Sequence, residues 1–277
     1  MRVRPLFQYT GSKYRSAEQI VQHLPSRYTR YFEPFVGGAS ILAHARPARA
    51  VAADLNGALI EMWHLVQREP DRLVQEYLDF YYDHISNPRA TFTRVRSRFN
   101  RRPNGSDFFF ILQSSYAGII RFNRRGEFSS GTRYIGVPRP EEVSRRVQQW
   151  HGLVRDVKFV HCDFESVVER AGRGDFIYAD PPYLGCERPM YGAYSFEVRR
   201  LYDALQRAKA RGARIALSID AERAGRRIRV KLPEGLFEQN HLIHVGPTGP
   251  FYYSKGKVGP KSMPMRDRLL LSWGSDA

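Results

Sequence analysis

The sequence contains little that would place the protein in a membrane or outside the cell. No apolar run approaches the length of a membrane span, and residues 1–5 lack the apolar stretch of a signal peptide. We therefore expect an intracellular protein. There are only two cysteines, Cys162 and Cys186, and they form neither a zinc-binding pattern nor a disulfide framework.

Acidic residues are scarce relative to basic ones. The chain has 28 aspartates and glutamates against 44 lysines and arginines, which gives a formal charge of +16. This excess predicts a polyanionic partner, with nucleic acid as the first candidate and an anionic membrane surface as the second. At 277 residues and 42% hydrophobic content, the chain can form one large domain, or a main domain with an insertion, around a sizeable core.

The arginines are concentrated in the middle of the chain. Between Arg94 and Arg139 there are ten arginines but only two acids. Residues 121–128 interleave them with aromatic rings and one amide. Arginine can read guanine or hold phosphate, asparagine can pair with an adenine edge, and an aromatic ring can wedge into a base stack. A basic surface loop with two core phenylalanines is the alternative, and the net charge favours contact with nucleic acid.

Residues 31–56 have the pattern of a nucleoside-binding strand–helix–strand unit. An aromatic strand leads into Gly37 and Gly38, a short helix follows, and a second strand over 49–53 ends at Asp54. An acid about 20 positions after such a turn can accept hydrogen bonds from both ribose hydroxyls. The alternative is a unit without a ligand, in which Asp54 caps a helix.

The segment just before this unit is a glycine-containing loop that carries a cation. Residues 8–14 precede a short helix, and Ser16 with Gln19 resembles a capping box at its start. The backbone N–H groups of such a loop can hold a carboxylate or phosphate, and Lys13 adds positive charge. An ordinary unliganded loop is the alternative.

The remaining chain divides into a helical middle and a second alternating part. Residues 61–150 have helical spacing, whereas strands are expected over 157–160, 175–179 and 213–219, and a C-terminal hairpin over 237–244 and 268–273. Acids follow or end several strands: Asp54, Asp163, Asp180 and Asp220. This placement is typical of ligand binding at the carboxyl edge of a parallel sheet.

The strand over 175–179 ends in the tetrad Asp180, Pro181, Pro182 and Tyr183. The carboxylate and the Pro181 carbonyl can accept hydrogen bonds from an exocyclic amine, so that the nitrogen lone pair points at an electrophile. Tyr183 can stack on the ring that carries the amine. The tetrad therefore predicts a reaction at the amine of a flat base without a covalent intermediate. A plain turn is the alternative.

Along the chain, the cofactor segments come first, the arginine-rich region lies in the middle and the tetrad follows. In this order, the segments resemble the Dam-like DNA adenine-N6 methyltransferases, which use S-adenosyl-L-methionine. The resemblance implies an α/β fold: a Rossmann-like methyltransferase sheet flanked by helices, with an inserted, mainly helical target-recognition domain that carries a hairpin. Residues 1–60 and 151–277 would form the catalytic domain, and residues 61–150 the target-recognition domain.

The resemblance also assigns roles residue by residue. Asp180, Pro181, Pro182 and Tyr183 match the catalytic tetrad without change, Asp54 the ribose-binding acid, and Lys13 the residue at the methionine end of the cofactor. Asp163 and Phe164 match the pair that holds the cofactor adenine. The implied cofactor set is Tyr9, Gly11, Lys13, Glu33, Pro34, Phe35, Gly37, Gly38, Ser40, Asp54, Asn56, Asp163, Phe164 and Asp180. The implied DNA-binding set is Arg121, Phe122, Asn123, Arg124 and Arg125.

The chain departs from the family pattern at Ser12, at Gly38 and Ala39, and at Ile219. Gly38 and Ala39 stand where the family has alanine followed by glycine, and Ile219 stands where it has asparagine. Because only glycine adopts positive φ without strain, the exchange at Gly38 and Ala39 raises the question whether the turn keeps the same dihedral angles. No role is carried over to Ile219.

The resemblance implies an enzyme that flips an adenine in a short target of double-stranded DNA and methylates its N6 nitrogen. A cytoplasmic monomer acting at the nucleoid is expected, without membrane contact, and a cognate restriction nuclease is left open. Methylation of cytosine N4 or of adenine in RNA by the same fold stays an alternative, as does a non-catalytic DNA-binding regulator. Methylation at cytosine C5 is disfavoured because no cysteine follows a proline as that nucleophilic mechanism requires.

Overall fold

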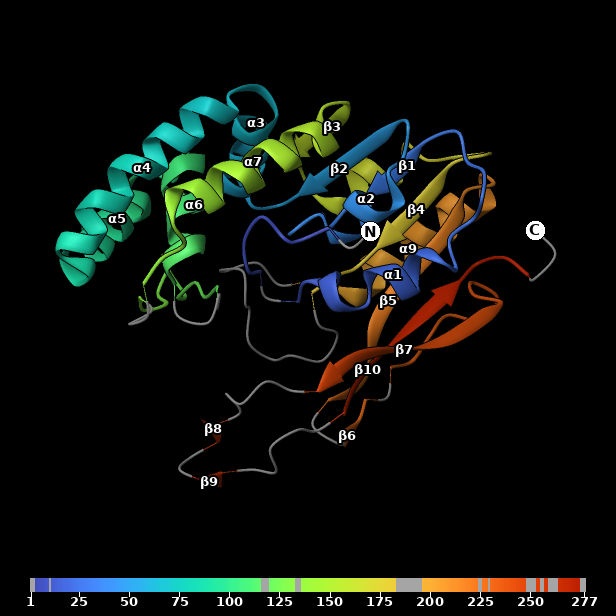
Figure 1. Ribbon diagram of the computed structural model, residues 1–277. Coiled ribbons are helices and arrows are strands. Elements are labelled where there is room, and N and C mark those ends of the chain that lie inside the picture. Colours follow the sequence, from blue (N-terminus) through green and yellow to red (C-terminus); the bar gives the residue numbers. More distant parts are fainter. Residues whose placement is uncertain are drawn as a thin grey trace.

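The computed structural model describes residues 3–9, 11–115, 120–132, 136–182, 196–223, 226–228, 230–247, 253–254, 257–258 and 264–274. Its centre is a sheet with the strand order β3-β2-β1-β4-β5-β10-β7, and β6 pairs with β5 (Figure 1). The strands are β1 (Tyr31–Glu33), β2 (Ala50–Asp54), β3 (Val157–His161), β4 (Phe176–Ala179), β5 (Arg214–Arg223), β6 (Arg226–Arg227), β7 (Gln239–Pro247) and β10 (Pro264–Leu271). A separate ladder joins β8 (Tyr253–Ser254) to β9 (Lys257–Val258).

The first five strands of the sheet run parallel to one another, and β10 runs antiparallel to both β5 and β7. The central strands β1, β2 and β4 are short, mainly apolar and buried, as is typical of strands covered on both faces. Alternate residues enter different cores: Tyr31 and Tyr178 lie on one face, whereas Phe32 and Ile177 lie on the other. Burial of both faces of the sheet therefore fixes the positions of the strand ends.

Helices cover the two faces. On the Tyr31 face lie α1 (Ala17–Val21), α2 (Ser40–Ala45) and the 3-10 turn η1 (Lys13–Arg15). On the Phe32 face lie α8 (Phe164–Val168) and α9 (Val198–Ala210). Leu201, Leu205 and Ala208 form an apolar stripe on α9, and all three are fully buried.

The helical middle consists of α3 (Gly57–Arg68), α4 (Pro70–Ser86), α5 (Pro88–Arg101), α6 (Gly105–Ser114) and α7 (Pro140–Val154). In Figure 1, α4, α5 and α6 lie at the left, whereas β7 and β10 lie at the lower right. Prolines stand at the first helical position of α4, α5 and α7, where the missing N–H is not needed. The expected division after residue 60 falls inside α3, whose Trp63 stacks on Phe159 of β3 at 5.6 Å.

Two local expectations are wrong. Ser16 makes no side-chain cap; its hydroxyl donates to the Lys13 carbonyl at 3.3 Å. Gln19 instead accepts a hydrogen bond from the backbone N–H of His244 on β7 at 3.0 Å, so a tertiary contact replaces the capping box. Asp220 lies within β5 and not at its end, because β5 extends beyond β4 to pair with β10.

Candidate active site

The carboxyl ends of β1 and β4 lie side by side where the strand order reverses. From β1 the chain continues to β2 on one side, and from β4 it continues to β5 on the other. Ligands of open parallel sheets bind at such a switch point. Here it carries the loop after Glu33 from β1 and Asp180 from β4.

The loop after β1 has a tightly fixed backbone. Gly37 has a φ of 43°, and a Cβ there would lie 3.1 Å from the Tyr9 ring. The Gly37 carbonyl accepts a hydrogen bond from the Trp63 indole at 3.0 Å. Ala39 has a φ of 52°, so the turn keeps a left-handed residue although that residue is alanine. This conformation costs an L-residue about 1–2 kcal/mol, which the surrounding contacts must offset.

Asp54 connects this loop to the end of β2. One of its carboxylate oxygens accepts from the Gly37 N–H at 3.1 Å, and the other accepts from the Asn56 N–H at 3.0 Å. Burial raises the pKa of Asp54. Its suggested role as a helix cap is wrong, because Asn56 caps α3 by accepting from the Leu59 N–H at 3.2 Å. Each carboxylate oxygen has a second lone pair, so Asp54 suits two neighbouring hydroxyls of a ribose.

Aromatic rings gather beside the loop. Phe35 stacks on Phe164 with ring centroids 5.3 Å apart, and Phe196 lies 5.9 Å and 5.8 Å from these two rings. Asp163 caps α8 by accepting from the Glu165 N–H at 3.1 Å. A carboxylate next to flat apolar rings suits a purine that carries an amine. Phe196 was not anticipated from the sequence, because it precedes α9 and lies far from both motifs along the chain.

Lys13 is the buried cation of the site. Its ammonium lies 2.6 Å from the Asp180 carboxylate and 3.7 Å from that of Asp267, and its side chain is only 7% exposed. A buried ammonium requires such partners, because removing it from water is costly. Asp267 belongs to β10 and was not anticipated, although an acid beside the apolar run 269–271 was the available signal. Lys13 thus links the N-terminal loop to Asp180 at the end of β4 and to Asp267 on β10.

Glu33 is the last residue of β1, which pairs with β4, and it is almost completely buried. The Tyr31 hydroxyl donates a hydrogen bond to its carboxyl at 2.7 Å. The pKa of Glu33 is raised to about 8, mainly by burial and in part by the charge of Asp180, against the lowering effect of hydrogen bonds from Tyr31 and from the Leu42 backbone. At neutral pH, Glu33 is therefore mainly a neutral acid, unlike an ordinary glutamate.

This protonation predicts a pH-dependent stability. The Glu33 pKa is about 8 in the folded protein against 4.5 for an ordinary glutamate, so folding takes up a proton between these values. The stabilisation is complete below pH 4.5 and is lost as the pH rises through about 8. One such group gives a slope of about 1.4 kcal/mol per pH unit. We expect Glu33→Gln to remove this slope in urea unfolding measured from pH 5 to pH 8. Exposed Glu61→Gln is the control and should keep the slope of the wild type. An equal slope in the wild type and in Glu33→Gln would contradict the assignment.

The other predicted cofactor residues are also close to the loop. Ser40 shares a hydrogen bond of 2.9 Å with Ser12, which ties η1 to α2. Gly11 has a φ of 80°, and its carbonyl accepts from Lys13 at 3.4 Å. Pro34 and Gly38 belong to the loop itself, and Pro181 and Pro182 follow Asp180 directly. Tyr183, the fourth member of the tetrad, lies outside the described residues, and so does Cys186.

Residues 121–129 form the expected hairpin beside the helical middle. Phe122 and Phe128 pair across it, and their rings meet edge to face at 5.7 Å. The side-chain oxygen of Asn123 accepts from the backbone of Arg125 and Glu127, and its amide nitrogen donates to the Glu127 carboxylate. Phe128 is buried, while Arg121, Arg124 and Arg125 are exposed. The hairpin therefore presents arginines to solvent and uses Asn123 to build its own turn.

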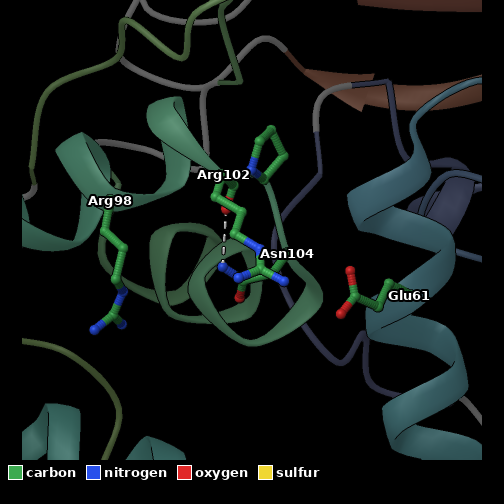
Figure 2. Close-up of a pocket in the computed structure, with 5 residues that line it drawn as sticks. Glu61, Arg98, Arg102 and Asn104 are labelled. Atoms are coloured by element: carbon green, nitrogen blue, oxygen red, sulfur yellow. Dashed lines mark hydrogen bonds between the residues drawn. The ribbon is translucent and has the colours of Figure 1, made fainter.

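A hollow lies among α3, α5 and α6, away from the carboxyl ends of β1 and β4 (Figure 2). It is lined by Glu61, Arg98, Arg102, Pro103 and Asn104. Asn104 donates to the Arg102 carbonyl at 3.1 Å, and Arg98 is paired with buried Asp107. This hollow contains none of the predicted cofactor or catalytic residues.

None of the described helices combines the length and apolar character needed to cross a membrane. In the same part of the chain, no three histidine, cysteine, aspartate or glutamate side chains are grouped as around a metal ion.

The sheet order, the glycine loop after β1, the acid ending β2 and the Asp-Pro-Pro sequence after β4 define a Rossmann-like methyltransferase. Residues 9–220 match the D12 class N6 adenine-specific DNA methyltransferases, and the chain belongs to this family. The family and the fold imply a methyl donor of the S-adenosylmethionine type.

Two relatives and one solved structure are similar to this chain. The chain is 30% identical to the DNA N-6-adenine-methyltransferase of Escherichia phage P1, over 78% of this chain but only 29% of that protein. It is 28% identical to the type II methyltransferase M.MjaIII of Methanocaldococcus jannaschii, over 79% of this chain and 84% of that protein. The rRNA methyltransferase aviRa of Streptomyces viridochromogenes superposes over 92% of this chain and 82% of its own, with a TM-score of 0.39 and 14% identity.

Proposed function

We propose that this protein transfers a methyl group from S-adenosyl-L-methionine to the N6 nitrogen of adenine in double-stranded DNA. The observation that carries the proposal is the position of Asp180, Pro181 and Pro182 at the end of β4, beside the loop of β1. When bound, the donor supplies an electrophilic methyl group on a sulfonium. The fixed loop at Gly37, the Asp54 carboxylate and the rings of Phe35 and Phe164 suit its nucleoside.

In this proposal, Asp180 and the Pro181 carbonyl accept hydrogen bonds from the adenine amine and orient its lone pair. As the methyl–nitrogen bond forms and the methyl–sulfur bond breaks, positive charge develops on N6, and the Asp180 carboxylate stabilises it. The proton that N6 then loses passes to Asp180 or to water. Holding the two reacting atoms in line contributes much of the rate.

Lys13 would position Asp180. Its ammonium contacts an oxygen of that carboxylate at 2.6 Å and lies 3.7 Å from the carboxylate of Asp267. A fixed charge partner keeps the carboxylate in one orientation before the substrate arrives. Extruding adenine from the duplex costs a few kcal/mol, which stacking on Tyr183 and hydrogen bonds in the pocket would offset.

The exposed arginines of the hairpin would contact DNA. We expect the double variant Arg124→Ala and Arg125→Ala to weaken DNA binding. The slope of log affinity against log salt concentration should fall by the equivalent of about two phosphate contacts. Fluorescence anisotropy over a series of salt concentrations measures both effects. Replacing exposed Arg68 and Arg155 is the control for net charge. Equal salt slopes in the two double variants would contradict a contact at the hairpin.

One chain carries both the predicted site and the hairpin, which supports a monomer as the active unit. The type II methyltransferase from Methanocaldococcus jannaschii among its relatives supports a role beside a cognate restriction nuclease.

The acceptor class is tested with donor labelled in its methyl group. We expect label to enter unmethylated duplex DNA and not RNA of the same sequence. Transfer to RNA alone would replace the proposed substrate. Binding of donor and DNA without any transfer would support a non-catalytic regulator instead.

A further inference from the structure

We propose that Arg200, in the first turn of α9, is a positioning residue for recognition of the donor's adenine ring. The inference rests on the proposed function, because it concerns Asp163 and Phe164, the pair expected to hold the donor's adenine. No motif of the sequence pointed to Arg200, which lies 37 positions after Asp163 and on a different helix. Its guanidinium reaches both residues of the pocket.

The first contact fixes the direction of a carboxylate. Arg200 donates a hydrogen bond to one oxygen of Asp163 at 3.0 Å, and the Glu165 N–H donates to the same oxygen at 3.1 Å. Two donors on one oxygen set the rotation of the carboxyl group. Among the described residues, the second oxygen of Asp163 makes no hydrogen bond, and it can accept from an exocyclic amine. A purine bearing such an amine is therefore the chemical group that this arrangement fits.

The second contact covers the neighbouring ring. The Arg200 guanidinium lies 5.3 Å from the centroid of Phe164, within the range of a cation–π interaction. Phe164 in turn stacks on Phe35 at 5.3 Å. Arg200 thus holds the acid that would read the amine and also contacts the ring beside it.

A nearby arginine shares the surroundings of Arg200 but not these contacts. Arg200 and Arg207 both pair with Glu165, at 2.7 Å and 2.8 Å, and their side chains are equally exposed at 45%. Arg207 continues to Glu169 at 3.5 Å, away from Asp163. Exposed pairs of this kind contribute little to folding stability, so both arginines can be replaced in a folded protein. Arg207→Ala is therefore a matched control for Arg200→Ala.

The test measures binding of S-adenosylhomocysteine by calorimetry, which needs no turnover. We expect Arg200→Ala to weaken binding about 10-fold, the loss expected for one charge-assisted hydrogen bond at a partly exposed site. Arg207→Ala should stay within about twofold of the wild type, as expected for a surface pair. Lysine should not restore affinity, because its single ammonium cannot contact Asp163 and Glu165 in the forked geometry of arginine.

A second ligand separates recognition of the amine from a general effect on the pocket. S-inosylhomocysteine has a carbonyl in place of the adenine amine, so the Arg200→Ala loss should shrink to about twofold for this ligand if Arg200 acts through Asp163. An equal loss for both ligands, an equal loss in Arg207→Ala, or an unchanged affinity in Arg200→Ala would overturn the inference. If the wild type binds S-adenosylhomocysteine, each of these results leaves the proposed function standing. Failure of the wild type to bind would instead remove the proposed donor.

Discussion

Replacing Asp180 with asparagine is expected to lower the rate of methyl transfer by about 10³-fold, because the variant loses the negative charge that stabilises the developing cation on N6. Asparagine has nearly the same shape, and the Lys13 ammonium keeps its second carboxylate, Asp267, at 3.7 Å. The fold and the nucleoside side of the pocket should therefore survive. The prediction separates a loss of chemistry from a loss of binding.

The measurement is a single-turnover rate with labelled donor and saturating DNA, together with the dissociation constant of the donor. Asp203→Asn, which removes an exposed carboxylate on α9, is the control for net charge. A rate in Asp180→Asn within about tenfold of the wild type would show that this carboxylate does not carry the chemistry.

The second large effect is expected at Asp54. Asp54→Ala removes the acceptor for the Gly37 and Asn56 N–H groups, at 3.1 Å and 3.0 Å, as well as the acid proposed to hold the ribose. Hydrogen bonds to a charged group contribute about 1.5–3 kcal/mol each, so we expect donor affinity to fall by about 100-fold. DNA affinity should change little, because the hairpin is built independently of this loop.

A destabilised loop could weaken binding without any direct contact, so the comparison needs a variant of similar stability. Asn104→Ala removes the side-chain cap of α6, a hydrogen bond of 2.9 Å to the Asp107 N–H, at a typical loss of about 1 kcal/mol. Calorimetric titration of both variants with S-adenosylhomocysteine distinguishes the two cases. Unchanged donor affinity in Asp54→Ala would mean that the nucleoside binds elsewhere.

Local sequence patterns were sufficient where a single stretch of chain determines the structure. The apolar runs of β2 and β4 predict buried parallel strands, and the spacing from Gly37 to Asp54 predicts a nucleoside unit, whose backbone the structure confirms. The turn at residues 121–128 forms the expected hairpin, because its hydrogen bonds lie within the segment. In these cases, sequence neighbours are also spatial neighbours.

Sequence patterns failed where a side chain is used by a distant element. Gln19 has the spacing of a capping box but bonds to His244, 225 positions away. Asp267 joins the Lys13–Asp180 ion pair only because β10 inserts between β5 and β7, an order that no local pattern specifies. Arg200 reaches Asp163 through the packing of α9 beside α8. Such contacts depend on tertiary packing and leave no periodic signal in the sequence.

The proposed reaction is methyl transfer to the exocyclic amine of adenine at the motif that begins with Asp180. The most direct test incubates the protein with methyl-labelled S-adenosylmethionine and unmethylated genomic DNA, digests the DNA to nucleosides and separates them. We predict that the label is found in N6-methyldeoxyadenosine. Label in N4-methyldeoxycytidine would contradict the assigned base, because the same geometry would then act on a different amine.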